Sequence, residues 1–443
     1  MKINQKKLTR QKKVVQNWIN NNYFGTLEAV TGFGKTYTCI LAMKEVLKMN
    51  PNATFIIVVP RDPLRTMWRH EMNVHNIPNV VVDTIHMLAK QNMSCDMLIL
   101  DELHMYVGED AEVFPLIFEN TSFKKCLGLT ATLGRKGIRR DIVDQYCPVI
   151  DTVDTEEALR EGYVAQYITY NLGIPLSQED SIKYAKINNQ FYRCFGIFNN
   201  NFDIVKACLS ESGARPTARR LGWETGAVIG YATKAFKYMR ERKQFLYGVD
   251  SKLKVAKEIM EMFPDKKIIT FSQTTQPADK LARMVDNCES YHSNIPTRLY
   301  VGNRIIGEKL GKDLYEIFDT GEELSWKQVK QKYNDVERYG TKRLRSKILS
   351  DFKEGKINRL CTAQALDVGY DDEDIQGGII LSGSSKNRQD IQRSGRIIRV
   401  KDGKRAFIVQ LFITDTQDEK WLDKRQTNTE NVKRIYSVSQ IEV

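Results

Sequence analysis

Short apolar runs and longer amphipathic stretches alternate along the first third of the chain. We interpret the apolar runs as strands, and they lie at residues 25–30, 55–59, 80–85, 97–100 and 126–130. The last four residues before position 101 are continuously apolar, as expected of a strand buried on both faces of a sheet. Segments between the runs, such as 36–49 and 64–75, repeat apolar residues every three to four positions, which predicts amphipathic helices. Strands that alternate with helices favour a doubly wound parallel sheet.

The second half of the chain repeats this alternation and predicts a second α/β unit. Its predicted strands lie at residues 166–174, 267–271, 359–362 and 378–381. We therefore expect two lobes, the first over residues 1–165 and the second over residues 166–443. Two segments interrupt the second lobe: a helical insertion at about 178–247, and a further insertion at about 295–340, to which the sequence assigns no function.

The segment AVTGFGKT joins the first predicted strand to the first long helix. A glycine-rich turn at a helix N-terminus presents backbone N–H groups to phosphate oxygens. Gly32 and Gly34 let the backbone approach a phosphate closely. Lys35 can reach the β- and γ-phosphates of a nucleotide, and the hydroxyl of Thr36 can bind Mg²⁺. The stricter general pattern requires glycine at Ala29, so the alternative is a strand–helix turn with a solvent-exposed lysine.

Two adjacent carboxylates, Asp101 and Glu102, follow a predicted buried strand. Asp101 can hold Mg²⁺ opposite Thr36, and Glu102 can orient and deprotonate an attacking water. The alternative is that the pair only caps the following helix. Lys35, Asp101 and Thr130 all follow predicted strand ends, and doubly wound sheets bind ligands at the carboxyl ends of their strands. One crevice could therefore hold all three residues.

Two further segments contain candidate nucleotide contacts. Gln11 lies on a predicted N-terminal helix that is basic, and its amide offers both a donor and an acceptor to an adenine edge. This basic helix either has a solvated surface or contacts phosphate directly. Near the C-terminus, Gln392 precedes Arg396 and Arg399, whose spacing places them on one face of a helix. Two guanidiniums on one face suit a triphosphate, and the alternative is a basic surface helix.

Composition restricts the class of protein. A chain of 443 residues is too long for a single core. With 67 Lys and Arg against 55 Asp and Glu, the formal net charge of +12 fits a polyanionic partner such as nucleic acid. No apolar run approaches the roughly 18 to 20 residues that a membrane span needs, so we expect no membrane association. The eight cysteines form no CxxC pair, which argues against structural zinc and for reduced thiols in the cytoplasm.

Six segments occur in the order found in superfamily 2 helicases of the DExH type, which the chain resembles. These segments are AVTGFGKT (29–36), DELH (101–104), LTAT (129–132), ITFSQT (269–274), TAQALDVGYD (362–371) and QRSGRIIR (392–399). Within this superfamily the chain looks most like phage UvsW-type enzymes, which remodel branched DNA. The resemblance implies two tandem RecA-like lobes, with motifs I to III in the first and motifs IV to VI in the second. It also implies ATP and Mg²⁺ as cofactors.

The resemblance implies roles for individual residues as well. The candidate catalytic residues are Lys35, Asp101, Glu102, Gln392, Arg396 and Arg399. The candidate nucleotide-binding residues are Gln11, Gly32, Gly34, Lys35, Thr36, Gly369 and Asp371, with Thr36 and Asp101 at the metal. His104, Thr130 and Thr132 would couple hydrolysis to motion.

The helical insertion has a pattern of its own. Predicted helices lie at residues 203–210, 215–222 and 225–243, and Gly222 is the expected C-cap of the second. Two helices joined by a short glycine-containing turn, the later one longer and basic, resemble a helix-turn-helix. The candidate contacts to nucleic acid are Arg219, Arg220, Lys234 and Lys237. The alternative is a small helical subdomain with a solvated basic face.

Three functions are compatible with the sequence. The first is a DNA motor that works as a monomer in the cytoplasm (of a host cell, if the chain is phage-encoded) and unwinds or branch-migrates forked or branched duplexes. The second is an RNA helicase or remodeller. The third is an ATP-switched nucleic-acid-binding module, or the motor subunit of a larger nuclease assembly. The insertions contain no obvious metal-dependent nuclease cluster, which weighs against intrinsic cutting activity.

Overall fold

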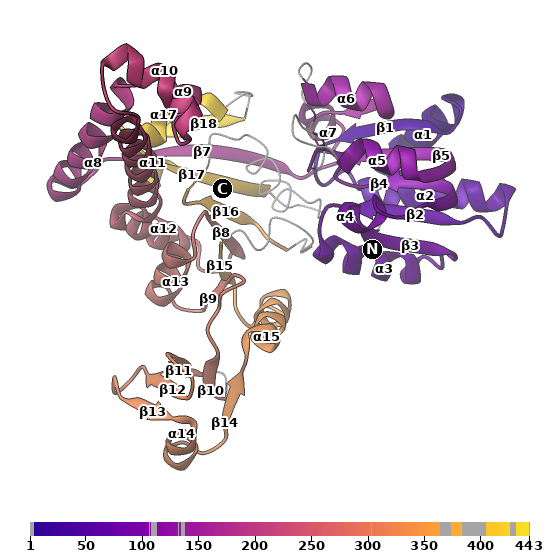
Figure 1. Ribbon diagram of the computed structural model, residues 1–443. Coiled ribbons are helices and arrows are strands. Elements are labelled where there is room, and N and C mark those ends of the chain that lie inside the picture. Colours follow the sequence, from indigo (N-terminus) through magenta and orange to yellow (C-terminus); the bar gives the residue numbers. More distant parts are fainter. Residues whose placement is uncertain are drawn as a thin grey trace.

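The computed structural model describes residues 4–105, 107, 113–131, 133, 138–302, 304–363, 374–382, 405–425 and 431–442. Two parallel sheets form the centres of two α/β lobes, and two insertions extend from the second lobe (Figure 1). The predicted fold class, α/β with two doubly wound parallel-sheet lobes and a helical insertion, is confirmed. Within the described residues, no helix is long and apolar enough to span a lipid bilayer.

The first lobe is built on a parallel six-stranded sheet with the order β3-β2-β4-β5-β1-β6. Its strands are β1 (Phe24–Ala29), β2 (Phe55–Val59), β3 (Val80–Thr84), β4 (Met93–Leu100), β5 (Thr121–Thr130) and β6 (Val149–Val153). Its helices are α1 (Gln5–Asn20), α2 (Lys35–Met49), α3 (Asp62–Val74), α4 (Ile85–Leu88), α5 (Val113–Asn120), α6 (Ile138–Tyr146) and α7 (Thr155–Arg160), with a 3-10 turn η1 (Leu103–Met105).

Strand β2 shows why this sheet is covered on both faces. All five of its residues are buried, and alternate residues enter different cores because side chains point to opposite faces of a strand. Phe55, Ile57 and Val59 pack with α1, α2 and α3 in one core. Ile56 and Val58 pack with α4, α5 and α6 in the other. A strand that lies between two helical layers is apolar at every position. The continuous apolar run at 55–59 predicted this strand.

Strands β4 and β5 begin earlier than the apolar pattern predicts. The predictions were 97–100 and 126–130, whereas the strands start at Met93 and Thr121. Their added residues include polar side chains, but Met93 pairs with Thr121 and continues the ladder between the two strands. A strand can extend for as long as the neighbouring strand offers backbone hydrogen-bond partners. The pattern of side chains along one strand does not predict where those partners end.

The second lobe is built on a parallel seven-stranded sheet with the order β18-β7-β17-β16-β8-β15-β9. Its strands are β7 (Gln166–Ile174), β8 (Ile268–Ser272), β9 (Cys288–Tyr291), β15 (Arg359–Ala363), β16 (Gly377–Ile380), β17 (Arg405–Ile413) and β18 (Val432–Ile435). Its helices are α12 (Asp250–Met262), α13 (Thr275–Met284), α15 (Thr341–Lys353) and α17 (Gln417–Arg425), with a 3-10 turn η2 (Val438–Gln440). Strand β7 precedes the helical insertion, yet it pairs along its whole length with β17 near the C-terminus.

The helical insertion folds around a core of its own. It comprises α8 (Gln178–Gly196), α9 (Phe202–Ala207), α10 (Glu211–Leu221) and α11 (Thr225–Gly248). Its buried core includes Phe191, Phe195 and Val228, which come from α8 and α11. Gly222 ends α10 with φ of +67° and its N–H donates to Ala218, which confirms the predicted C-cap.

Helix α10 begins four residues before its predicted start. The prediction placed Arg215 and Pro216 at the start of this helix. Instead the side chain of Ser210 caps the helix, and Pro216 lies inside it. A proline there leaves the carbonyl of Ser212 without an N–H partner from the helix, and Ser212 is exposed, so water can hydrate that carbonyl.

The second insertion is a small antiparallel sheet, here called the β-subdomain (residues 298–339). It comprises β10 (Arg298–Val301), β11 (Arg304–Lys309), β12 (Leu314–Ile317), β13 (Glu323–Ser325), α14 (Trp326–Lys332) and β14 (Val336–Tyr339), with the strand order β13-β12-β11-β10-β14. It has its own buried cluster around Leu299, Tyr315 and Val329. Figure 1 shows it projecting from the second lobe, at the opposite end from the helical insertion.

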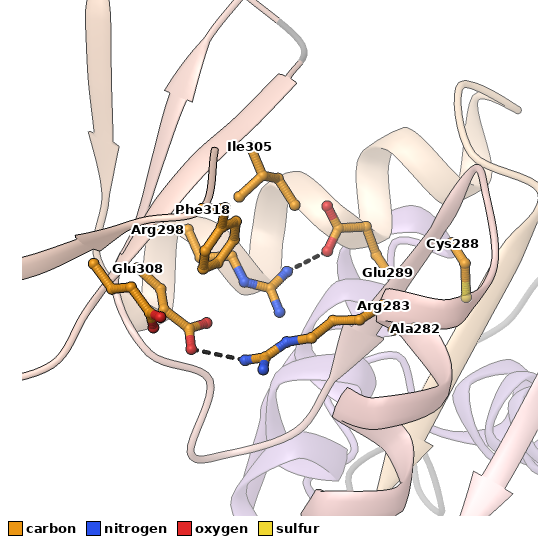
Figure 2. A pocket seen from close by; sticks show the side chains of 9 residues that line it. Ala282, Arg283, Cys288, Glu289, Arg298, Ile305, Glu308 and Phe318 are labelled. Carbon is orange, nitrogen blue, oxygen red and sulfur yellow. Dashed lines mark hydrogen bonds and ion pairs between the residues drawn. The ribbon is translucent and has the colours of Figure 1, made fainter. Parts of the chain in front are cut away.

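A cavity of about 390 Å³ lies where the β-subdomain meets the second lobe (Figure 2). Two ion pairs cross it: Arg298 with Glu289, and Arg283 with Glu308, whose Nη2 and Oε1 are 2.7 Å apart. Arg298 also donates to the hydroxyl of Ser290 at 2.9 Å. The described residues that line the cavity include none of the candidate nucleotide-site residues. We therefore assign these ion pairs to the attachment of the β-subdomain.

We predict that Arg298→Ala loosens the β-subdomain far more than Arg283→Ala. The side chain of Arg298 is 8% exposed, and that of Arg283 is 63% exposed. Burial raises the pKa of Glu289 and the charge of Arg298 opposes this, so removing Arg298 leaves a buried carboxyl with the hydroxyl of Tyr300 as its remaining side-chain donor. Breaking a pair with two buried side chains costs about 3–5 kcal/mol, whereas Arg283 is largely in water, where an ion pair contributes about 0–1 kcal/mol. Hydrogen exchange of the β10 and β11 amides measures the difference, and equal effects of the two substitutions would contradict it.

Candidate functional site

The loop between β1 and α2 has the backbone geometry of a phosphate cradle. Gly32 and Gly34 have φ angles of +94° and +91°, in the left-handed region that favours glycine. Position 34 requires glycine for a second reason as well. A Cβ added there would lie only 2.7 Å from Nε2 of Gln11. The loop ends at Lys35, the first residue of α2, so that the helix N-terminus faces the turn.

Two side chains from α1 hold this loop from behind. Gln11 is 4% exposed, and its Nε2 donates to the carbonyl of Phe33 at 2.9 Å. Lys7, one helical turn earlier, donates through Nζ to the carbonyl of Gly32 at 2.6 Å. Gln11 therefore lies against the phosphate loop, and its contact with adenine stays a prediction. Sequence reasoning missed Lys7, although its spacing of four residues from Gln11 places both on one helix face.

The loop between β1 and α2 (residues 30–34), here called the phosphate loop, also touches the segment that joins the two lobes. Phe33 is fully buried, and its ring packs edge-on against Tyr163, with the ring centroids 5.6 Å apart. Tyr163 lies between α7 of the first lobe and β7 of the second. A change in the loop can therefore reach the connection between the lobes through one aromatic contact.

Asp101 lies at the carboxyl end of β4, 5% exposed, with a hydrogen bond to each carboxylate oxygen. Trp68 Nε1 donates to Oδ2 at 2.7 Å, and the backbone N–H of Glu102 donates to Oδ1 at 3.0 Å. Burial and the charge of Glu102 raise the pKa of Asp101 to about 7, against the opposing effects of Trp68 and of the charge of Lys35. Nζ of Lys35 donates to the carbonyl of Ala29 at 3.1 Å. The charge of Lys35 thus acts on Asp101, and a shared crevice for Lys35, Asp101 and Thr130 stays a prediction.

The residues present fit a divalent cation. A buried carboxylate whose pKa is raised by burial and by a second carboxylate gains most from a neighbouring positive charge. Each oxygen of Asp101 accepts a hydrogen bond and keeps a second lone pair for a ligand. Oxygen ligands, few in number, suit Mg²⁺ that is also bound by phosphate. Asp101 and the hydroxyl of Thr36, at the start of α2, would hold this ion.

Glu102, His104 and Thr130 are brought together at the ends of β4 and β5. His104 Nδ1 lies 3.3 Å from Glu102 Oε2 and 3.0 Å from Thr130 Oγ1. His104 is 4% exposed and Thr130 is fully buried. Glu102 has φ of +47°, a left-handed conformation that is strained for a residue with a Cβ and is typical of functional sites. One histidine thus links the candidate base to the strand that carries Thr130.

Several candidate residues lie outside the part of the chain that the structure describes. They are Thr132, Gly369, Asp371, Gln392, Arg396 and Arg399. Their roles stay predictions, as does the contribution of the second lobe to the nucleotide site.

The four candidate nucleic-acid contacts differ in their surroundings. Arg219, Lys234 and Lys237 are exposed on α10 and α11. Arg220 instead donates through Nη2 to the carbonyl of Ile197 at 2.7 Å and through Nη1 to Asn199 at 3.2 Å. Ile197 is the C-cap of α8, so Arg220 helps to hold two helices of the insertion together. The sequence did not predict this structural role.

Two family models match separate parts of the chain. The model described as type III restriction enzyme, res subunit, matches residues 4–82. The model described as helicase conserved C-terminal domain matches residues 313–401. The first match spans α1, the phosphate loop and α3, and the second begins inside the β-subdomain.

Two curated proteins are similar to the chain at low identity. The DNA 3'-5' translocase XPB2 of Sulfurisphaera tokodaii is 23% identical over 440 residues, which cover 94% of this chain and 83% of that protein. The ATP-dependent DNA helicase MPH1 of Scheffersomyces stipitis is 24% identical over 179 residues, which cover 38% of this chain and 16% of that protein.

Two solved structures match the chain, and one of them resembles it in fold. The type ISP restriction-modification enzyme LlaBIII bound to DNA matches with a TM-score of 0.56 at 12% identity, over 98% of this chain and 31% of that one. The Hef helicase domain of Pyrococcus furiosus matches with a TM-score of 0.49 at 13% identity, over 94% of this chain and 97% of that one. The family models and the curated relatives, together with the two parallel α/β lobes, show that the chain is similar to ATP-dependent DNA helicases and translocases, in agreement with its resemblance to superfamily 2.

Proposed function

We propose that this enzyme is a DNA motor that unwinds or branch-migrates forked or branched duplexes, as UvsW-type enzymes do. The observation that carries the proposal is the set of exposed basic side chains on α10 and α11 (Arg219, Lys234 and Lys237), in an insertion attached to the second lobe. Two curated relatives support DNA as the nucleic acid, because one is named as a DNA translocase and the other as a DNA helicase.

The surface of α11 suits a phosphate backbone. Gly226, Gly230, Lys234 and Lys237 are exposed at spacings of three and four residues, so they follow one another along one helix face. Apart from the chain neighbours and the nearby backbone of α11 itself, no heavy atom of the described residues lies within 4 Å of a Cβ built at either glycine. A face that is small at one end and cationic at the other lets a sugar–phosphate chain approach closely. Such contacts favour phosphate over base edges, as a motor that moves over any sequence requires.

The nucleotide site would work as follows. Lys35 and the backbone N–H groups of the loop bind the phosphates, and Glu102 orients a water and accepts its proton. Mg²⁺, held by Thr36 and Asp101, would neutralise charge that develops on the phosphates. His104 contacts both Glu102 and Thr130, so it can pass a change at the base to β5.

Coupling to movement would use both lobes. Gln392, Arg396 and Arg399 would approach the phosphates from the second lobe, so that bound ATP draws the lobes together. Hydrolysis removes that bridge and the lobes part, which shifts the grip on the nucleic acid in each cycle. The packing of Phe33 on Tyr163 gives the loop a physical connection to the segment between the lobes.

We predict that Glu102→Gln abolishes ATP turnover and preserves ATP binding. The amide keeps the shape of the side chain but cannot accept a proton from water. Lys35→Ala should also stop turnover, and it should weaken ATP binding because it removes a cation that binds the phosphates directly. Single-turnover hydrolysis and nucleotide titration separate these outcomes. Hydrolysis at the wild-type rate by Glu102→Gln would exclude Glu102 as the base.

We predict that replacing Arg219, Lys234 and Lys237 together with alanine weakens binding to forked DNA and flattens its salt dependence. The slope of log affinity against log salt should fall by about 0.9 for each phosphate that the variant no longer neutralises. ATP turnover without DNA should stay at the wild-type level, because these residues lie outside the nucleotide site. Arg220 is left intact here, since its hydrogen bonds to Ile197 and Asn199 stabilise the insertion.

The matched control for this experiment is on the β-subdomain. Lys312, Lys327 and Lys330 are exposed there, and replacing them with alanine removes the same charge. If both triple variants weaken DNA binding equally, the effect is one of net charge and the role of the insertion is refuted.

The choice between DNA and RNA is open to a direct test. ATP turnover is measured with single-stranded DNA, duplex DNA, a four-way junction and RNA in turn. We expect the strongest stimulation by the junction or a fork. Strongest stimulation by RNA would favour an RNA remodeller, and equal stimulation by all four would favour a binding module that ATP switches.

A further inference from the structure

We propose that Trp68 is a positioning residue for the Asp101 carboxylate, and that its indole N–H sets the affinity of the nucleotide site for its divalent cation. This inference rests on the proposed role of Asp101 as a metal ligand. Trp68 lies in α3, 33 positions before Asp101 in the chain, and its Nε1 lies 2.7 Å from Oδ2 of that carboxylate. Nothing in the spacing of the two residues predicts the contact.

The indole holds the carboxylate together with one backbone group. Trp68 donates to Oδ2 and the N–H of Glu102 donates to Oδ1, so both oxygens are fixed and the plane of the carboxylate cannot rotate freely. A donor on each oxygen leaves the remaining lone pairs pointing in defined directions. A metal ligand must be held in this way for its lone pair to meet the ion, and groups that orient ligands often matter nearly as much as the ligands.

The donor is itself held rigidly. Trp68 is fully buried, and α3 is tied to β3 by two arginines on the same helix. Arg65 donates to Asp83 at 3.0 Å, and Arg69 donates to the carbonyl of Val82 at 3.2 Å. Because α3 packs against the sheet and is tied to an edge strand, the position of the indole is held by contacts that do not involve the carboxylate.

The electrostatic environment makes this bond matter. Asp101 is buried beside a second carboxylate, so its charged form has few favourable partners. A hydrogen bond to a charged acceptor in such a site is stronger than one to a neutral acceptor. Without the indole N–H, Oδ2 loses its donor where water cannot easily replace it. The carboxylate is then held by the N–H of Glu102 alone and can rotate away from the orientation that suits the cation, so the site binds the cation less tightly.

The alternative is that Trp68 only fills the core, and the chain contains a matched comparison. Trp18 in α1 is also fully buried, and its Nε1 donates at 2.8 Å to the backbone carbonyl of Cys126. Both tryptophans therefore contribute the same volume and the same type of donor to the first lobe. They differ in the acceptor, which is a neutral carbonyl for Trp18 and the proposed metal ligand for Trp68.

The test measures cation binding directly, without turnover. Mn²⁺ serves as the probe, and its free concentration is followed by electron paramagnetic resonance with the full chain and ADP. We expect Trp68→Phe to weaken Mn²⁺ binding by about 10-fold or more, the usual effect of losing a group that orients a metal ligand. Trp18→Phe should leave Mn²⁺ affinity unchanged. Both substitutions should lower the thermal unfolding midpoint, because each removes a buried hydrogen bond.

The outcomes separate this inference from the proposed function. Equal Mn²⁺ affinities of the Trp68→Phe and Trp18→Phe proteins would reduce Trp68 to a packing residue. Wild-type Mn²⁺ affinity in Asp101→Asn would instead show that Asp101 is no metal ligand. If Trp68→Phe does not fold, 3-benzothienylalanine introduced at position 68 alone keeps the ring shape and replaces the N–H by sulfur. The same loss of Mn²⁺ affinity is expected for that protein, and wild-type affinity would overturn the proposal.

Discussion

The buried carboxylate of Asp101 is the constraint on which the candidate site depends. A negative charge at the end of a buried strand is costly unless donors and a cation surround it. The first lobe supplies an indole from α3, a backbone N–H from Glu102 and the positive charge of Lys35. These groups come from three separate segments, so the sheet order must bring β1, β2 and β4 close together. The order β2-β4-β5-β1 does so, with the carboxyl ends of the strands at one edge.

Around this carboxylate, the loop, the base and the link between the lobes form one connected set of contacts. Lys7 and Gln11 hold the loop from α1, while Phe33 joins it to Tyr163. On the other side, His104 joins the candidate base to β5. A nucleotide bound at this loop would therefore act on several elements at once. Coupling of chemistry to movement requires such connected elements with more than one arrangement.

The two insertions are independent of this set because each folds around its own core. The helical insertion presents exposed lysines on α11, whereas the β-subdomain joins the second lobe through two ion pairs and through Tyr300, which packs in a core shared with the lobe. A subdomain with its own core can be added to a lobe without disturbing the parallel sheet, since only its attachment must fit. This explains how β7, before the helical insertion, still pairs with β17 more than 230 residues later.

The two parallel sheets, the glycine-rich turn and the adjacent acids Asp101 and Glu102 could be predicted from the chain alone, because periodicity, glycines and neighbouring acids are local signals. The contacts of Trp68 with Asp101, Lys7 with Gly32 and Arg220 with the end of α8 became visible in the folded chain. The antiparallel sheet of the β-subdomain also came from the structure alone, since its short strands have weak patterns. Each of these features joins residues far apart in the chain or depends on which backbone groups a neighbour leaves available. The local pattern of residues in a single sequence therefore does not predict such contacts.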